Sequence, residues 1–175
     1  MNKHEADRNL GLILTEFRNY QQGILPTGPG ARGLIEFFAD IDQNPAIEPA
    51  APKIQRNDRD ILNLLSKRSE VLHLGPANYC WFTDPTRALC LKLAGTPTAT
   101  KPLIGMCDSA RCPQATHHPI HRDVWAEHAQ RTKTFLGQLG KTRTTERERL
   151  TSDHTRPQRI VTAIDTAARG ASDQS

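Results

Sequence analysis

The chain has 175 residues and carries 23 Lys and Arg against 19 Asp and Glu, a net charge of +4, so it accommodates one ordinary domain or two small ones. Hydrophobic residues make up 37% of the chain and aromatic residues 5%, which is low for one large core and favours one or two small cores. No apolar run approaches the roughly 20 residues that a membrane-spanning helix needs, and charges interrupt the N-terminal residues. We therefore expect no membrane contact and no signal peptide, and we place the protein in the cytoplasm.

Residues 1–42 are predicted to form an N-terminal helical segment. From Leu10 to Tyr20, apolar residues recur at steps of three and four, which places them on one face of a helix that stops at Gly23. The turn-rich stretch LPTGPGARG follows, and the residues after it favour a second short helix, whose Leu34 can pack on the first.

A proline-rich linker and a third helix are predicted next. Residues 43–56 contain three prolines within QNPAIEPAAPK. Because proline fixes φ and lacks an N–H, we expect an extended linker and a domain boundary there. Asn57 or Asp58 is a suitable N-cap for a helix that the sequence predicts to end at Gly75.

A short β-hairpin is predicted after the third helix. The pair Asp84-Pro85 favours a turn, and apolar residues alternate from Leu89 to Leu93 as they would in a half-buried strand. This hairpin would place one cysteine on each side of its turn.

Residues 119–168 are predicted to form a C-terminal helical hairpin. The helical periodicity returns at Trp125, and Gly140 separates two helical patterns that a short turn would join. Pro157 lies within the second pattern and is expected to kink or split that helix, because it removes a backbone hydrogen bond at a cost of ~3 kcal/mol. Residues 169–175 are expected to be a disordered tail.

All four cysteines lie within 33 residues, with the spacing C-x9-C-x16-C-x4-C. Disulfides are rare in a reducing compartment, whereas a structural zinc ion binds four soft ligands such as thiolates at ~2.3 Å. The region around the cysteines is short and poor in apolar residues, and a metal would supply the missing folding energy. We therefore predict a structural zinc site in a small β and loop module, zinc-ribbon-like, within residues 57–118. Its predicted ligands are Cys80, Cys90, Cys107 and Cys112. The alternative is four buried or free thiols.

The histidines that follow the last cysteine are competing ligands. With the cysteine pair, His118 and His121 would give a pattern similar to that of a zinc finger with two cysteine and two histidine ligands. Such a finger places a helix between its cysteines and its histidines, and Pro113 and Pro119 leave no room for one. We therefore expect four cysteine ligands, with His118 and His121 as the alternative ligands.

A metal-dependent nuclease is a further and less favoured interpretation. A cysteine pair followed by His117-His118-Pro119 is similar to the start of a ββα-metal, HNH-like nuclease, in which a histidine activates water beside a divalent metal ion. Such a site also requires a later asparagine, and the last asparagine of this chain is Asn78, which precedes the cluster.

Charge is distributed unevenly along the chain. Residues 1–60 carry 7 Lys and Arg against 9 Asp and Glu, a net of −2, and residues 61–175 carry 16 against 10, a net of +6, which sum to the total of +4. A basic half favours contact with phosphate groups, so DNA is the expected partner. The candidate phosphate contacts are Arg111, Arg122, Lys133, Lys141, Arg143, Arg147 and Arg149. Alternatively, residues 119–168 are a protein-interaction module that pairs with itself or with a partner helix.

Two stretches of the sequence together resemble a known family. They are NDRDILNLLSKRSEVLHLGPANYCWFTDPTRALCLKLAG and MCDSARCPQATHHPIHRDVW, which contain the segment DPTRALC and the four cysteines. They are similar to the C-terminal region of large actinobacterial site-specific integrases and transposases of the tyrosine-recombinase type, over roughly residues 57 to 168. The resemblance implies a zinc-ribbon-like module followed by a helical hairpin, attached to an enzyme that rearranges DNA.

The resemblance does not extend to the catalytic domain of such enzymes. A tyrosine recombinase needs an arginine, a His-x-x-Arg box and a nucleophilic tyrosine, spread over a domain of more than a hundred residues, and we expect this catalytic set to be absent. Tyr20 and Tyr79 are the tyrosines of this chain. We therefore expect a mainly α protein that is no enzyme. It would be a free-standing or truncated integrase tail, a non-catalytic accessory region involved in DNA integration and recombination.

Overall fold

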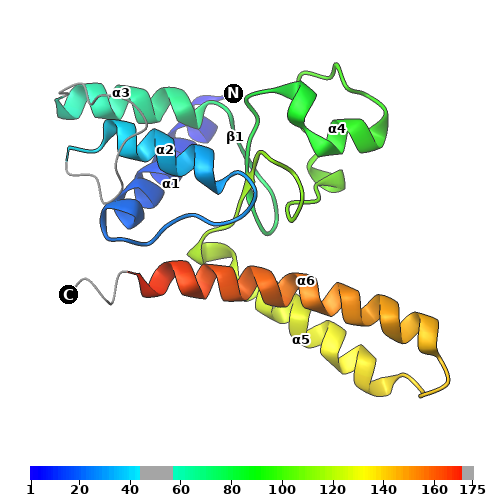
Figure 1. The fold of residues 1–175 in the computed structure, drawn as a ribbon. Coiled ribbons are helices and arrows are strands. Elements are labelled where there is room, and N and C mark those ends of the chain that lie inside the picture. Colours follow the sequence, from blue (N-terminus) through cyan, green and yellow to red (C-terminus); the bar gives the residue numbers. More distant parts are fainter. Residues whose placement is uncertain (44–56, 171–175) are drawn as a thin grey trace.

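The computed structural model of the protein describes residues 1–43 and 57–170. This part of the chain is mainly helical and has a small three-stranded antiparallel sheet at its centre (Figure 1), which confirms the predicted mainly α class. The N-terminal helices lie on one side of the sheet, the cysteine-rich loops lie on the other, and the last two helices run below both. The predicted linker 43–56 and tail 169–175 fall almost entirely outside the described residues, so both stay predictions.

Two N-terminal helices form where the periodicity predicts them. Helix α1 spans Lys3–Gln21 and begins with a capping box: the Asn2 side chain accepts a hydrogen bond from the Glu5 N–H, and the Glu5 carboxylate accepts one from the Asn2 N–H. Helix α2 spans Ala31–Ile41. The apolar faces of the two helices meet in one core.

That first core also includes residues from beyond the segment 44–56. Helix α3 spans Asp58–Ser69, and its Leu65 is 1% exposed in the same cluster as Ile13 of α1 and Phe38 of α2. The predicted linker therefore does not separate two hydrophobic cores, because helices on both sides of it bury their apolar faces together.

Helix α3 is shorter than the sequence predicts. It ends at Ser69, where the Asn9 side chain of α1 donates hydrogen bonds to the Ser69 carbonyl at 3.3 Å and to the first carbonyl of strand β1 (Leu72–Leu74) at 3.0 Å. Gly75 occupies the turn after β1 instead of ending the helix. The Asn78 side chain packs where a Cβ of Gly75 would stand, so a larger residue at this position would displace Asn78.

The central strand divides the molecule into two cores. Strand β2 (Tyr79–Trp81) pairs antiparallel with β1 on one side and with β3 (Ala115–Thr116) on the other. Because successive side chains of a strand point to opposite faces, Tyr79 and Trp81 join the core of the N-terminal helices, whereas Cys80 points away from it. On that other face lies a second, smaller core, formed by Cys80, Phe82, Ala88, Cys90 and Leu91.

The predicted β-hairpin around Asp84 is wrong. Residues Pro85–Arg87 form a 3-10 turn, η1, and Leu89–Ala94 form a short helix, α4. The Asp84 carboxylate accepts a hydrogen bond from a backbone N–H of η1 at 2.9 Å, which starts a helical turn instead of a hairpin turn. The alternating leucines are misleading because Leu91 is buried and Leu93 is 55% exposed, on different faces of a helix.

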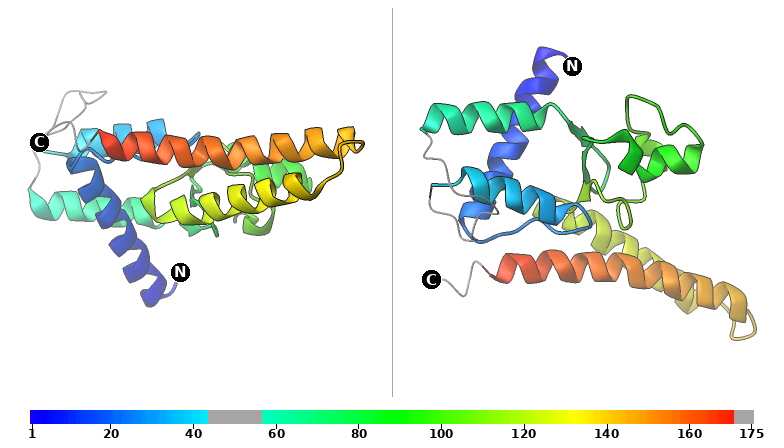
Figure 2. Two further views of the ribbon diagram at one scale, coloured as in Figure 1. Left: turned by 90° about the horizontal axis from the view of Figure 1, so that it is seen from below. Right: turned by 45° about the horizontal axis from the view of Figure 1, so that its top comes forward.

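The predicted C-terminal helical hairpin is confirmed. After two more 3-10 turns, η2 (Ile104–Met106) and η3 (Pro119–His121), helix α5 spans Arg122–Gln138 and helix α6 spans Thr144–Arg169. The two helices pack antiparallel along most of α5 (Figure 2). Pro157 does not split α6, which is one continuous helix with the Pro157 ring buried.

Two polar contacts anchor the start of the hairpin. The Arg122 guanidinium donates to the Asp165 carboxylate at 2.6 and 3.1 Å, and Trp125 Nε1 donates to the Ala77 carbonyl in the β1–β2 turn at 2.8 Å. The far end of the hairpin projects beyond the rest of the molecule (Figure 2). Within the described part of the chain, no helix combines the length and the apolar character needed to cross a membrane.

Candidate metal centre and buried histidine network

The four predicted metal ligands line one small cavity. Cys80 comes from β2, Cys90 from the first turn of α4, and Cys107 and Cys112 from the two ends of the turn after η2. The cavity has a volume of about 10 Å³, which is room for one atom-sized occupant. Asp108 also lines it, and no histidine does among the described residues.

Gln114 connects the two segments that carry the cysteine pairs. Its Oε1 accepts hydrogen bonds from the Thr83 and Asp84 N–H groups at 2.9 and 2.8 Å, and its Nε2 donates to the Asp84 carbonyl at 2.9 Å. This buried side chain therefore holds the turn between the first two cysteines against the chain that leaves the last two. Gln114 is not predictable from the sequence as a site residue, because a single glutamine in a loop carries no local signal.

Two of the cysteine sulfur atoms accept hydrogen bonds. The Leu103 N–H donates to Cys90 Sγ at 3.4 Å, and Asn78 Nδ2 donates to Cys107 Sγ at 3.7 Å. Such donors orient thiolate ligands and stabilise their negative charge at metal sites. The Asn78 contact depends on Gly75, against which the Asn78 side chain packs.

The four cysteines share a cavity, but their sulfur atoms are not placed as the ligands of a tetrahedral metal site. Burial raises the pKa of the Cys80 thiol to about 12, and the nearby thiols of Cys107, Cys112 and Cys90 contribute to that rise. Within residues 1–43 and 57–170, no group of three or more His, Cys, Asp or Glu side chains is placed so that it could hold a metal ion. A change of χ1 rotamer would move a cysteine sulfur while leaving the backbone in place.

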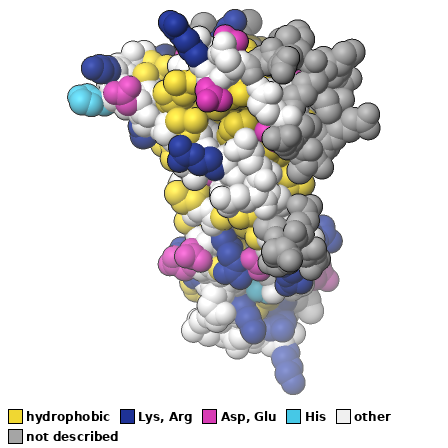
Figure 3. Space-filling view, turned by 90° about the vertical axis from the view of Figure 1, so that its left-hand side faces the viewer, with side chains coloured by type: hydrophobic (Ala, Val, Ile, Leu, Met, Phe, Trp, Pro, Cys, Tyr) yellow, Lys and Arg dark blue, Asp and Glu magenta, His cyan; other side chains and the backbone are white. Residues whose placement is uncertain are grey.

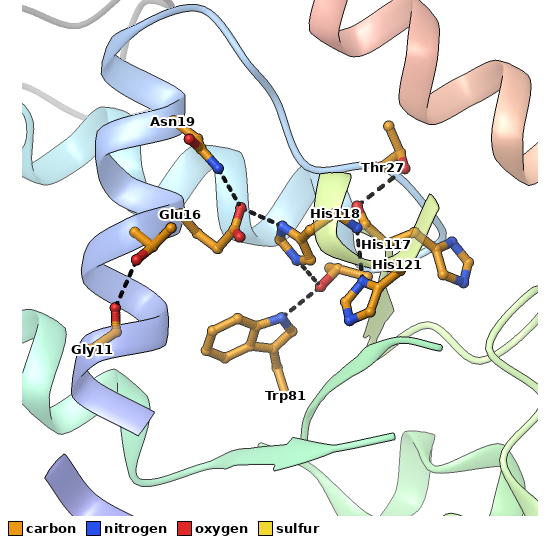
Figure 4. A network of polar contacts seen from close by, with 10 residues as sticks. Gly11, Glu16, Asn19, Thr27, Trp81, His117, His118 and His121 are labelled. Atoms are coloured by element: carbon orange, nitrogen blue, oxygen red, sulfur yellow. Dashed lines mark hydrogen bonds and ion pairs between the residues drawn. The ribbon is translucent and has the colours of Figure 1, made fainter. Parts of the chain in front are cut away.

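The alternative ligands, His118 and His121, lie away from the cysteine cavity. The His118 ring is buried between α1 and β3, with Nδ1 2.7 Å from Glu16 Oε2 and Nε2 2.6 Å from Thr116 Oγ1 (Figure 4). Both of its ring nitrogens are therefore engaged. His121 Nδ1 accepts a hydrogen bond from the His118 N–H at 3.0 Å, and its ring stands edge-on to the Tyr79 ring, with centroids 4.6 Å apart.

One tautomer of His118 satisfies every donor and acceptor of this network. With the proton on Nδ1, the His118 ring donates to Glu16 and accepts the Thr116 hydroxyl proton at Nε2. The Thr116 oxygen in turn accepts a hydrogen bond from Trp81 Nε1 at 2.9 Å. The assignment of the proton follows from this pattern of partners.

The same network has the connectivity of a hydrolase triad, with a hydroxyl, an imidazole and a carboxylate in sequence. The Thr116 side chain is 0% exposed and its oxygen already accepts from Trp81 Nε1, so no substrate atom reaches it in this conformation. The network joins α1 to the sheet, and its evident role is structural.

His117 lies on the hairpin side of the same segment. Its Nε2 is 2.9 Å from Ser109 Oγ, and its ring stands edge-on to Trp125, with centroids 5.5 Å apart. Burial lowers the pKa of His117 to about 4 and that of His121 to about 3. Both rings are therefore neutral at pH 7.

Several predicted phosphate contacts are engaged inside the hairpin. Four form ion pairs with carboxylates: Arg111 with Asp108, Arg122 with Asp165, Arg143 with Glu146, and Arg149 with Asp153. Arg147 donates to the Leu136 and Leu139 carbonyls at 3.2 and 3.0 Å, at the end of α5. The other two, Lys133 and Lys141, are exposed. On the face drawn in Figure 3, Lys and Arg side chains are prominent at the height of the hairpin, below a more apolar upper part.

The His-x-x-Arg pattern of the recombinase catalytic set does occur once in the sequence. His128 and Arg131 on α5 are separated by two residues, which corrects the expectation that the set is absent altogether. Arg131 pairs with the exposed Glu127 at 3.0 Å, and the two tyrosines, Tyr20 and Tyr79, are buried in the first core. The spacing alone therefore assembles no recombinase centre in the described part of the chain.

Comparisons of the chain with protein-family models, with curated proteins and with solved structures find no match.

Proposed function

We propose that this chain is a non-catalytic accessory module, stabilised by one structural zinc ion, that contacts DNA in site-specific integration or recombination. The observation that carries the proposal is the convergence of four cysteines, from three separate segments, on one atom-sized cavity. The sequence resemblance to integrase tails and the net charge of +6 in residues 61–175 support the DNA role.

Zinc fits this donor set better than other common metals do. Four thiolates are soft ligands that favour zinc in a closed, structural site, in which no coordination position is left for a substrate. In the described part of the chain, five buried residues form the second core, so a bound ion would supply folding energy that apolar burial cannot.

The metal content of the purified full chain tests the zinc proposal. We expect one zinc per chain, lost in Cys107→Ser and retained in His121→Gln, which separates the cysteine set from the histidine alternative. If Cys107→Ser fails to fold, zinc titration of chelator-treated wild type, with about one equivalent bound and protons released, gives the same answer. Metal-free protein with a wild-type fold would overturn the proposal.

A DNA shift assay tests the proposed contact with DNA. We expect binding to duplex DNA at low salt that weakens steeply as salt is raised, because phosphate contacts release counterions. No binding even at low salt would remove the DNA role while leaving the zinc site untouched.

A protein-interaction module is the second candidate function. Phe135, in the last turn of α5, is 55% exposed, and a second helix pair would cover it. Measurement of molecular mass at two concentrations, with and without DNA, distinguishes the two roles, since self-pairing raises the mass without DNA. The nuclease interpretation gains no support from His118, because that ring is closed off from solvent.

A further inference from the structure

A second concave site lies on the other side of the cysteine turn. It has a volume of about 500 Å³ and is bounded by the Gly28-Pro29 loop, by the turn that carries Arg111, and by one face of α6. These three segments are far apart in the sequence.

Among the residues that the structure describes, three arginines line this pocket and no carboxylate does. Arg156 and Arg159 come from α6, and Arg111 comes from the cysteine turn. Among the described residues, neither Arg156 nor Arg159 has a carboxylate within ion-pair distance, and Arg111 is 61% exposed with Asp108 at 3.7 Å. Guanidinium groups that line one pocket repel one another, and an anion bound between them would offset that repulsion by attracting each of them.

One wall of the pocket is held by close packing and by hydrogen bonds. His117 lies in the lining, buried and bonded to Ser109, and Gly28 packs against its ring with a φ of 94°. The Thr27 and His117 backbones exchange two hydrogen bonds, of 3.0 and 2.8 Å, which hold the loop against the chain after β3. A rigid wall with movable arginine forks is suited to a tetrahedral oxyanion.

We infer that this pocket binds a phosphate group, through Arg111, Arg156 and Arg159. The inference goes beyond the proposed function, because the pocket would take a phosphate whether or not the chain acts in recombination. The phosphate belongs either to a nucleic-acid backbone or to a small phosphorylated ligand, and the chemistry of recognition is the same in both cases.

The test uses the full chain, inorganic phosphate and a fluorescent duplex of about 20 base pairs, long enough to cover a typical protein footprint. The variant Arg156→Gln/Arg159→Gln removes two charges from the pocket. Arg131→Gln/Arg169→Gln removes two charges from exposed helical positions outside it and serves as the matched control. Calorimetry measures phosphate binding, and anisotropy over a salt series measures duplex binding.

Whichever of the two probes the wild type binds, we expect the pocket variant to bind it at least about tenfold more weakly. For the duplex, the slope of log K against log salt should decrease in magnitude by about 2. The control variant keeps the wild-type affinity and slope. Competition between inorganic phosphate and the duplex identifies a backbone phosphate as the ligand. Phosphate binding that the duplex leaves unchanged identifies a small phosphorylated ligand.

Equal losses in the pocket variant and the control, or no phosphate or duplex binding to the wild type at low salt, would overturn the inference. Unchanged phosphate and duplex binding by the pocket variant would also overturn it, while leaving the proposed DNA contact standing. Zinc content is measured in every variant, so failure of the phosphate site is distinguishable from loss of the metal.

Discussion

His118 shows how a residue that resembles a site in the sequence becomes part of the scaffold. Its ring is hydrogen-bonded on both sides, to residues on two different elements, and is 0% exposed. A buried ring with both nitrogens paired is stabilised by those partners, and the loss of either leaves a polar atom without a hydrogen bond.

Removal of the Glu16 carboxylate should therefore destabilise the whole first core. Glu16→Ala leaves the His118 Nδ1 donor unpaired and is expected to lower the free energy of unfolding by about 2–3 kcal/mol. Glu16→Gln retains an acceptor oxygen and is expected to lose less. Urea unfolding of the two variants measures the difference, and equal losses would contradict the assigned hydrogen bond.

His117 and His121 predict an acid-sensitive fold. Burial holds their pKa values at about 4 and about 3, below the ordinary value of 6.5 that they regain on unfolding. Below pH 6.5 the unfolded chain thus binds protons that the native chain does not. Stability should be full above that pH and fall towards pH 4, with a slope of up to about 1.4 kcal/mol per pH unit for each histidine.

Urea unfolding between about pH 7.5 and about pH 4.5 measures this dependence, because the range spans the titration of unfolded histidine. The variant His117→Asn removes one of the two histidines, so its pH slope should be shallower by about one proton. A slope identical to that of the wild type would show that another group, such as a metal-bound thiolate, causes the acid sensitivity.

At the scale of elements, the long helices follow from local pattern and the short elements do not. The periodicity around Leu10 and the cap at Asn57 report contacts within a few residues, and α1 and α3 begin accordingly. Over the six residues that α4 spans, the spacing of the leucines near Cys90 is compatible with a strand and with a helix. The choice of helix α4 depends on the second core, to which β2 and the residues around α4 also contribute.

Arg147 illustrates the same dependence within the hairpin. Its guanidinium satisfies two carbonyl groups at the end of α5, which would otherwise face water. We expect Arg147→Gln to lower stability by about 1 kcal/mol and to loosen the α5–α6 turn, measured as faster amide exchange there. If the variant binds DNA more weakly but shows no faster amide exchange, Arg147 contacts phosphate directly instead of stabilising the turn.

At the scale of the whole molecule, a strand of three residues separates a larger helical core from a small cysteine-rich one. Removal of the proposed zinc ion with a chelator should therefore act locally. We expect amide protection to fall in α4 and in residues 107–112, while α1, α2 and α3 keep theirs, because their core is built from other residues.

Hydrogen exchange with and without chelator measures this effect, and added zinc should restore protection. Because Arg111 lies in the cysteine turn, the same treatment should weaken phosphate binding in the second pocket. Uniform loss of protection across both cores, or no loss at all, would contradict the two-core description.

The sequence by itself determined the mainly helical class and the C-terminal hairpin, because periodicity is a local property of the chain, and its spacing predicts the cysteine set. Only the tertiary structure decided that Cys80 lines one cavity with the other three cysteines, that His118 pairs with Glu16 across 102 residues, and that Arg156 and Arg159 line one pocket with Arg111. Each of these relations depends on how distant elements pack, and neither periodicity nor spacing records it.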